Sequence, residues 1–184
     1  RLDKLLRHAC RESSVYEELF AKAVMSVSGR PLSLVLYMYE VTPGDALALR
    51  HDRKFWVIFV TFLEFGRDLL RREELWLPLG VLRTKVANRV DGGISNVVRL
   101  LLKDTLFGQS NLSTAGARVR LAKGTSVLAR ARLSKVIADM DAHKSIFRLR
   151  GANGWRPCLR CKNVITKGAS GHGDGGYFVD ISCH

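Results

Sequence analysis

The sequence predicts an α/β fold in which helices and strands alternate around one mixed β-sheet. Two stretches, 32–41 and 54–65, are nearly continuous runs of apolar, β-forming residues, which is typical of strands buried on both faces. A third strand is expected around 76–84, and one apolar helical stripe follows it. The predicted order is therefore a three-strand meander, a helix and further strands. A helix that crosses back over a sheet usually delivers the next strand parallel to an earlier one.

The N-terminal residues 1–28 carry apolar side chains at helical spacing and are predicted to form helices. Ser14 is the expected N-cap of the second helical segment, with Glu17 as its capping-box partner. The Ser-Gly-Arg-Pro sequence at 28–31 is expected to end the helical part.

Turn and breaker residues place the next elements. Thr-Pro-Gly-Asp at 42–45 predicts a turn after the first strand. Pro78 lacks the donor that a sheet ladder needs, so the third strand is expected at an edge or at a bulge. A helix should open after Asp91-Gly-Gly and end at Gly108. Its expected buried stripe consists of Ile94, Val97, Val98, Leu101, Leu102 and Leu106.

The last third of the chain is predicted to contain strands at 117–123, 126–138 and 177–181, with a helix at 141–149. This order suggests three parts. They are an N-terminal helical arm at 1–30, a core at 31–150 and a small cysteine-containing appendage at 151–184.

The charge is strongly basic. The 184 residues carry a formal net charge of +13, and residues 117–184 contain 13 Lys and Arg against 4 Asp and Glu. Such a localised excess favours an anionic partner, most often nucleic acid. The alternative is that the charge serves only solubility.

Nothing in the sequence predicts a membrane segment. The longest apolar run, 55–65, is too short to span a bilayer and contains Glu64. The N-terminus is charged and amphipathic, so no signal peptide is expected and an intracellular protein is predicted. The chain starts at Arg1 rather than at Met, and we interpret it as a fragment.

Three of the four cysteines fall in the last 27 residues, and two of them form a C-x-x-C at Cys158 and Cys161. This spacing predicts a structural zinc site completed by Cys183 and one histidine. His184 is the first candidate for that histidine, and His172 is its rival. The alternative is three reduced thiols without a metal.

Acidic residues near strand ends are the candidates for catalysis. Asp139 and Asp141 follow the apolar run at 133–138, and Glu40 lies near the end of the first strand. If the strand before Asp139 lies beside the first strand, their carboxylates meet at the middle of the sheet, as in an RNase H-like core. Such carboxylates hold two divalent cations about 4 Å apart, which would be Mg²⁺ or Mn²⁺. The alternative is that Asp139 and Asp141 only stabilise a helix N-terminus.

Several stretches also carry a family resemblance. They are LVLYMYEVTPGDAL at 34–47, HDRKFWVIFVTFLEFG at 51–66, ELW at 74–76, DGGISNVVRLLL at 91–102 and IADMDAHKSIFRLRGANGWRPCLRCKNVI at 137–165. Over about residues 31–184, the chain resembles a protein family that is repeated many times in dinoflagellate genomes. That family in turn resembles the RNase H-like transposase core of CACTA/Plavaka-type DNA transposons, with a C-x-x-C zinc-binding insertion.

The resemblance implies a transposase-derived, DNA-binding domain in the nucleus whose ancestral activity is metal-dependent strand transfer. Asp139 matches the family's acid before the cysteines, and Cys158 and Cys161 match its cysteine pair. However, Tyr39 stands where the family has its first-strand Asp, and the neighbouring Glu40 should point to the opposite face. A phenol is a poor magnesium ligand at neutral pH. We therefore expect catalysis to be degenerate.

A basic segment around the cysteines is the expected nucleic-acid contact. It comprises Lys144, Arg148, Arg150, Trp155, Arg156, Arg160 and Lys162. We expect Trp155 to serve as a packing residue, and stacking on a base is the alternative. A competing function is a non-enzymatic, zinc-stabilised module that binds nucleic acid or protein.

Overall fold

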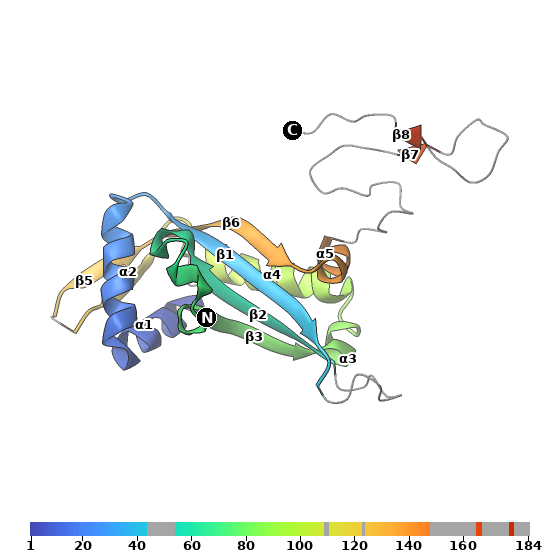
Figure 1. Ribbon diagram of the computed structural model, residues 1–184, viewed down its shortest axis with the longest axis horizontal. Helices are drawn as coiled ribbons and strands as arrows, with labels where there is room; N and C mark the ends of the chain where they lie inside the picture. The colour runs from blue at the N-terminus through green and yellow to red at the C-terminus, as the bar shows by residue number, and fades with distance from the viewer. Residues whose placement is uncertain (44–53, 109–110, 123, 148–164, 167–176, 179–184) are drawn as a thin grey trace. The chain divides into compact units, whose positions relative to one another are not determined.

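The computed structural model describes residues 1–43, 54–108, 111–122, 124–147, 165–166 and 177–178. The chain divides into two compact units, Arg1–Ala138 and Asp139–His184. The first unit contains four α-helices, three short 3-10 helices and six strands among these described residues (Figure 1). Their bounds are α1 Leu2–Glu12, α2 Ser14–Ser26, β1 Leu32–Val41, β2 Phe55–Phe62, η1 Leu63–Phe65, η2 Leu69–Arg71, η3 Glu73–Leu75, β3 Leu77–Arg83, α3 Thr84–Ala87, α4 Gly93–Phe107, β4 Ala117–Arg120, β5 Ser126–Ala129 and β6 Ala131–Ala138.

The main sheet has four strands in the order β3-β2-β1-β6. The first three strands form an antiparallel meander, and β6 pairs with β1 in parallel. The predictions of an α/β fold, of a mixed sheet and of a parallel strand beside the first one are therefore confirmed. The parallel register runs from Leu32 paired with Ala131 to Met38 paired with Ala138.

β3 is an edge strand with an irregularity where Pro78 predicts one. The register between β2 and β3 shifts after Ile58, so that Gly80 pairs with Ile58 and Pro78 pairs with Phe59. The extra residue, Leu79, is left without a partner. Because Pro78 has no N–H to donate, its place beside this bulge at the sheet edge follows from its chemistry.

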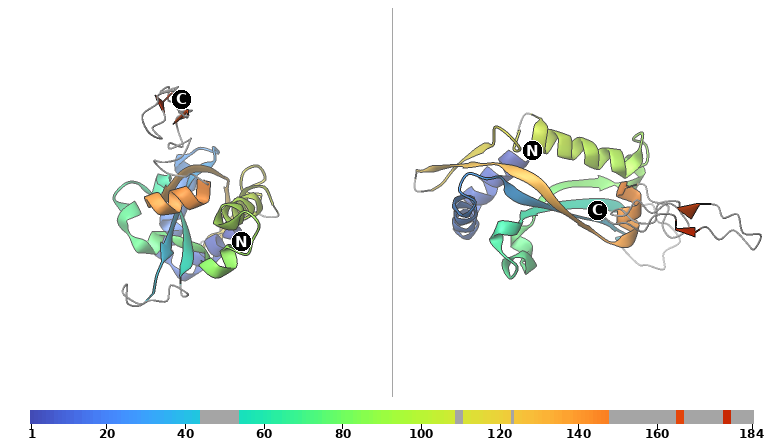
Figure 2. Two further views of the ribbon diagram at one scale, coloured as in Figure 1. Left: turned by 90° about the vertical axis from the view of Figure 1, so that its right-hand side faces the viewer. Right: turned by 90° about the horizontal axis from the view of Figure 1, so that it is seen from above.

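The two faces of the sheet differ. On one face, Leu34, Leu36, Met38, Ile58 and Val60 are each at most 2% exposed. Helix α4 runs along one side of the sheet, and the η1–η3 segment lies on the other (Figure 2). α4 begins after Gly92, which has a left-handed φ of 82°, and its first two turns bury Ile94 and Val98. The predicted start and end of this helix are confirmed. Its predicted stripe is buried only in part, because Val97, Leu101 and Leu102 are half-buried.

The N-terminal helices show where local sequence reasoning fails. Ser13 separates helices α1 and α2. Its side chain accepts a hydrogen bond from the Tyr16 N–H at 3.2 Å. Ser13, not Ser14, is therefore the N-cap, and the prediction of a capping box between Ser14 and Glu17 is wrong. Both serines are plausible caps in the sequence, and the β conformation of Ser13 decides between them.

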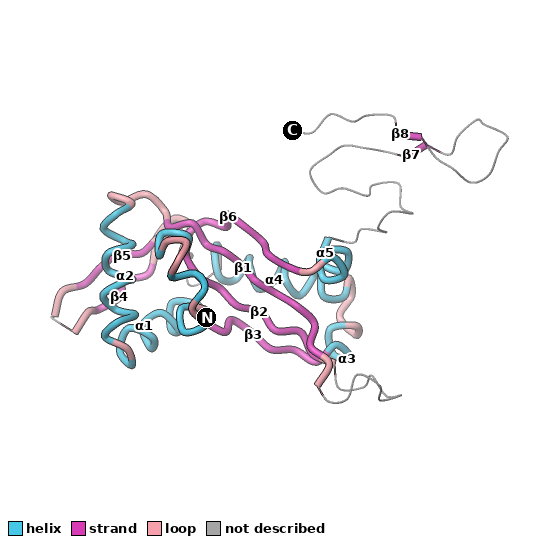
Figure 3. The backbone as a smooth tube through the Cα atoms, in the orientation of Figure 1, coloured by secondary structure: helices cyan, strands magenta, loops and turns pink. Residues whose placement is uncertain are grey.

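The β4–β5 hairpin forms a second, two-stranded sheet that contacts both N-terminal helices (Figure 3). The expected strand at 126–138 is divided into β5 and β6 at Arg130. Gly116 precedes the hairpin with φ +78°, and a Cβ there would lie 2.9 Å from the Ala129 carbonyl oxygen. This close approach of two backbones requires glycine.

The second unit has one helix and two short strands among its described residues. They are α5 Met140–Phe147, β7 Ile165–Thr166 and β8 Tyr177–Phe178, with β7 and β8 antiparallel. The predicted helix at 141–149 is observed as α5, and β8 falls within the predicted strand at 177–181.

Candidate nucleic-acid interface

One face of helix α1 is basic because its cationic residues are spaced at helical intervals. Lys4, Arg7 and Arg11 follow each other at three and four residues, so their side chains share a face. All three residues are exposed. On the opposite side of the helix, Leu2 and Leu6 are fully buried, which fixes the direction in which the basic face points.

Strand β4 presents two further arginines through its alternation. Ala117 and Val119 are buried, whereas Arg118 and Arg120 are exposed. Because successive side chains in a strand point to opposite faces, both arginines project from the same face of the hairpin. Helix α1 and strand β4 are in contact, so the two basic surfaces meet.

Between them lies a groove of about 1080 Å³, which we call the basic groove. Its basic lining consists of Lys4, Arg7, His8, Arg11, Arg118 and Arg120. Among the described residues that line it, Glu17 is the one acid. The Glu17 carboxylate accepts a hydrogen bond from the Ala122 N–H, which ties it to the hairpin. The groove therefore carries a concentrated positive charge.

The cationic side chains of the basic groove differ in whether they already form ion pairs with neighbouring side chains. Arg11 donates a 2.8 Å hydrogen bond to Glu12 and lies 3.0 Å from His8 Nδ1. The Arg11 hydrogen bond is the main cause that lowers the pKa of the exposed Glu12 carboxyl, followed by the Arg11 charge. Among the described residues, Lys4, Arg118 and Arg120 take part in no ion pair. These three side chains have their full charge available for an anionic ligand.

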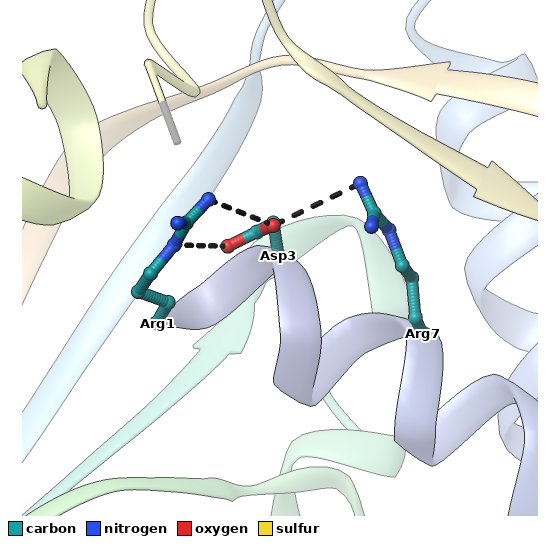
Figure 4. Close-up of polar contacts among 3 residues, drawn as sticks. All are labelled: Arg1, Asp3 and Arg7. Carbon is teal, nitrogen blue, oxygen red and sulfur yellow. Dashed lines mark hydrogen bonds and ion pairs between the residues drawn. The ribbon is translucent and has the colours of Figure 1, made fainter. Parts of the chain in front are cut away.

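Arg7 is positioned by the buried carboxylate of Asp3. Asp3 is 4% exposed and lies between the guanidinium groups of Arg1 and Arg7 (Figure 4). Arg1 Nε lies 3.3 Å from Asp3 Oδ1, and the Arg7 Nη2 atom lies 3.8 Å from Asp3 Oδ2. This arrangement holds the Arg7 stem against the helix while its side chain remains 54% exposed at the groove.

Cys10 lines the inner wall of the basic groove as a neutral thiol. It is 4% exposed, and burial raises its pKa from 9.0 to about 11, with a smaller contribution from the negative charge of Glu17. A thiol with a raised pKa is a poor nucleophile and a poor metal ligand at neutral pH. Cys10 therefore acts as a small buried apolar residue.

The acidic residues singled out from the sequence do not form a described metal site. Glu40 accepts a 2.6 Å hydrogen bond from the Thr84 hydroxyl and a 3.3 Å hydrogen bond from Lys54 Nζ. As predicted, Glu40 and Tyr39 point to opposite faces of β1. The Tyr39 ring stacks near Phe59, with the two centroids 6.4 Å apart.

Asp139 acts as the N-cap of α5. Its Oδ1 accepts a 2.7 Å hydrogen bond from the Ala142 N–H, and its carbonyl accepts one from the His143 N–H. Asp141 forms a 3.0 Å ion pair with Lys144. The helix-terminus interpretation of these acids is therefore the observed one. Lys144, which belongs to the predicted basic segment, is therefore ion-paired within α5.

The remaining predicted ligands and basic residues lie outside the described residues. They are Arg148, Arg150, Trp155, Arg156, Cys158, Arg160, Cys161, Lys162, His172, Cys183 and His184. Within the described part of the chain, no three or more His, Cys, Asp or Glu side chains converge as a metal would require. In the same part, no helix combines the length and the apolar character needed to cross a bilayer.

Comparison of the chain with protein-family models, curated proteins and solved structures found no match.

Sequence reasoning missed the basic groove although every residue in it was visible. The i, i+3, i+7 spacing of Lys4, Arg7 and Arg11 indicates a basic helix face, and the alternation in Ala-Arg-Val-Arg at 117–120 indicates a basic strand face. What the sequence does not contain is the contact between these two segments, which are separated by more than a hundred residues. That contact arises only in the tertiary fold.

Proposed function

We propose that this chain is a transposase-derived, RNase H-like domain that binds DNA in the basic groove and no longer cleaves it. The strand order supports the RNase H-like part of this proposal. An antiparallel three-strand meander is followed by a helix, and the next main-sheet strand is parallel to the first. This is the arrangement expected from the family resemblance over about residues 31–184. A DNA-binding role further implies a nuclear location.

The basic groove is the observation that carries the binding proposal. It draws cations from α1 and β4, and Glu17, the one acid among its described lining residues, accepts a hydrogen bond from a backbone N–H. Phosphate is the anion that such a surface fits best, because guanidinium groups donate paired hydrogen bonds to its oxygens. Backbone contacts of this kind bind nucleic acid with little dependence on sequence.

The orientations and hydrogen bonds of the candidate acids support the absence of catalysis. Tyr39 occupies the first-strand position where the family has its Asp. The Glu40 carboxylate points to the opposite face from Tyr39, and it already accepts hydrogen bonds from Thr84 and Lys54. Asp139 uses one carboxylate oxygen to cap α5. Two-metal chemistry needs several acidic oxygens that converge on one place. Magnesium would therefore find no ready set of ligands among these residues.

The proposal is tested by measuring duplex affinity at increasing salt concentrations. A groove that neutralises about four phosphates should lose about 100-fold in affinity between 50 and 200 mM salt. The double variant Arg118→Ala/Arg120→Ala should bind more weakly at low salt, and its log–log salt slope should fall by about 2.

A matched control is available on the same compact unit. Arg67 and Arg89 are exposed and lie outside the basic groove, so Arg67→Ala/Arg89→Ala removes the same charge elsewhere. This control should retain nearly the full affinity and slope. Equal losses in the two double variants would show that only net charge matters and would refute a localised site. A third variant, Arg156→Ala/Arg160→Ala, tests whether the predicted C-terminal basic segment adds contacts.

A further inference from the structure

A second groove, of about 570 Å³, lies on the face of the main sheet that carries Tyr37 and Tyr39. Its apolar lining comes from β1, β2, β6 and the segment before β3 and consists of Tyr37, Tyr39, Phe59, Leu70, Trp76 and Ile137. We call it the aromatic groove. Glu40 is on the opposite face of the sheet, and the basic groove shares none of these residues.

Four aromatic rings line this groove, and each ring contacts at least one of the others. The Tyr37 centroid lies 5.1 Å from that of Tyr39 and 5.7 Å from that of Trp76. Tyr39 lies 6.4 Å from Phe59 with the two ring planes only 14° apart. Trp76 is held in place because its Nε1–H donates a 3.0 Å hydrogen bond to the Leu70 carbonyl. The rings therefore form a preorganised surface.

The described part of the chain covers this sheet face unevenly. Val35 and Thr61, at one end, are each 1% exposed, and Val57, the β2 partner of Tyr39, is 7% exposed. Along the same face, Tyr37, Tyr39, Phe59 and Trp76 are only half-buried, and Ile137 is 45% exposed. On β3 the neighbouring Val81 is 64% exposed. Concave sites lined by aromatic and apolar side chains are where ligands usually bind.

We propose that the aromatic groove stacks the bases of single-stranded nucleic acid. Flat aromatic rings match the π-faces of bases, and such stacking tolerates any base sequence. The rim adds an exposed guanidinium from Arg71, suited to a phosphate, and a carboxylate from Glu73, suited to the exocyclic amine of a base. The net charge of +13 favours an anionic strand over an apolar peptide. This inference rests on the proposed nucleic-acid-binding function and adds a separate site to it.

The test compares two single strands of equal charge. One is a 12-nucleotide oligothymidylate, and the other is an abasic phosphodiester of the same length. The whole chain should bind the oligothymidylate at least about 10-fold more tightly than the abasic strand, because only the former can stack. Binding of the oligothymidylate should also quench tryptophan fluorescence, and Trp76→Phe should remove most of that quenching.

Variants locate the preference for bases. Tyr39→Leu/Phe59→Leu keeps an apolar surface but removes two rings, so it should abolish most of the preference for the base-bearing strand. Duplex affinity should not change, because the basic groove is intact. Phe107→Leu is the matched control, since Phe107 is 67% exposed on α4 and lies outside the aromatic groove. It should retain the full preference.

The possible failures are distinguishable. Equal affinity of the unaltered protein for the two strands, together with salt-dependent duplex binding, overturns the base-stacking inference and leaves the proposed function in place. Absence of binding to duplex and to both single strands overturns the two proposals together. If the double variant does not fold, the fluorescence of Trp76→Phe still decides whether bases reach the aromatic groove, because quenching by the oligothymidylate that is unchanged in this variant would overturn the inference.

Discussion

Glu40 and Thr84 are joined by a 2.6 Å hydrogen bond from the Thr84 hydroxyl to the Glu40 carboxylate. The bond links the end of β1 to the first residue of α3, where β3 has just ended. Lys54, which precedes β2, lies 3.3 Å from the other carboxylate oxygen. Glu40 thus connects three segments at one end of the sheet, which is a structural role and leaves it turned away from the Tyr39 face.

The first prediction compares how much the Thr84–Glu40 hydrogen bond and the Lys54–Glu40 ion pair contribute to stability. Thr84→Val should lower the free energy of unfolding by about 1–3 kcal/mol, because it leaves part of the Glu40 carboxylate without a donor. Lys54→Met should cost less than about 1 kcal/mol, since the Lys54 side chain is 33% exposed and water screens its charge. Urea denaturation measures both changes. A larger loss for Lys54→Met than for Thr84→Val would contradict this account of Glu40.

How far the sequence predicts the fold depends on whether a signal is local. The runs around Leu36 and Ile58 and the stripe from Ile94 predict their elements correctly because burial imposes the periodicity directly. Pro78 likewise predicts an irregular edge strand. The opposite orientations of Tyr39 and Glu40 follow from the two-residue period of a strand.

Other features depend on choices that the sequence does not settle. Ser13 and Ser14 are equally suited to cap α2, and only the backbone conformation selects Ser13. The three 3-10 helices between β2 and β3 have no periodic signal. The basic and aromatic grooves each assemble residues from distant segments, so neither could be predicted without the tertiary contacts.

The second prediction concerns the glycine that begins the β4–β5 hairpin. Gly116→Ala should destabilise the protein more than Gly124→Ala, although both glycines have φ near +80°. At Gly124 nothing lies within 4 Å of an added Cβ, so only the backbone strain of about 1–2 kcal/mol applies. At Gly116 the new Cβ also meets the Ala129 carbonyl oxygen at 2.9 Å. Thermal unfolding of the two variants measures the difference, and equal losses would show that the hairpin relaxes to admit the methyl group.

The third prediction is a pH dependence from Cys10. Its pKa rises from 9.0 to about 11 on folding, so the native state holds the thiol proton more tightly than the unfolded chain does. The resulting stability is fully present below about pH 9 and is lost as the pH rises toward 11. The loss is at most about 2.7 kcal/mol, since each pKa unit corresponds to about 1.36 kcal/mol.

Unfolding free energies of the unaltered protein and of Cys10→Ala between pH 8 and 11 test this prediction. The decline with pH should be shallower in Cys10→Ala, because the other titrating groups are common to both proteins. Parallel curves would mean that Cys10 keeps its ordinary pKa in the fold.

The fourth prediction concerns zinc in the C-terminal residues. Metal analysis should find about one zinc per chain, and Cys158→Ser or Cys161→Ser should abolish it, because the thiolates of a C-x-x-C supply half of a tetrahedral site. Cys10→Ser is the control and should retain the metal, since Cys10 belongs to the first compact unit. A metal-free protein that folds equally well would refute the zinc site. Comparing His172→Ala with His184→Ala should identify the fourth ligand.

The last prediction is that the chain does not cleave DNA with magnesium, and that Tyr39→Asp restores metal binding. The family resemblance implies an aspartate at position 39 that acts together with Asp139. Tyr39→Asp would supply this second carboxylate. Two carboxylates bind Mg²⁺ or Mn²⁺ more tightly than one, whereas a phenol contributes little at neutral pH.

Calorimetric titration of Mg²⁺ and Mn²⁺ into the unaltered chain and into Tyr39→Asp measures the effect, and both proteins are then incubated with duplex DNA. Tyr39→Phe is the control, because it removes the hydroxyl without adding a carboxylate and should bind metal no better than the unaltered chain. Cleavage by the unaltered chain that disappears in Asp139→Ala would show that catalysis survives. Equally weak metal binding by all three proteins would mean that Asp139, whose carboxylate caps α5, does not turn toward position 39. In that case the chain lacks the carboxylate arrangement that the RNase H-like proposal requires.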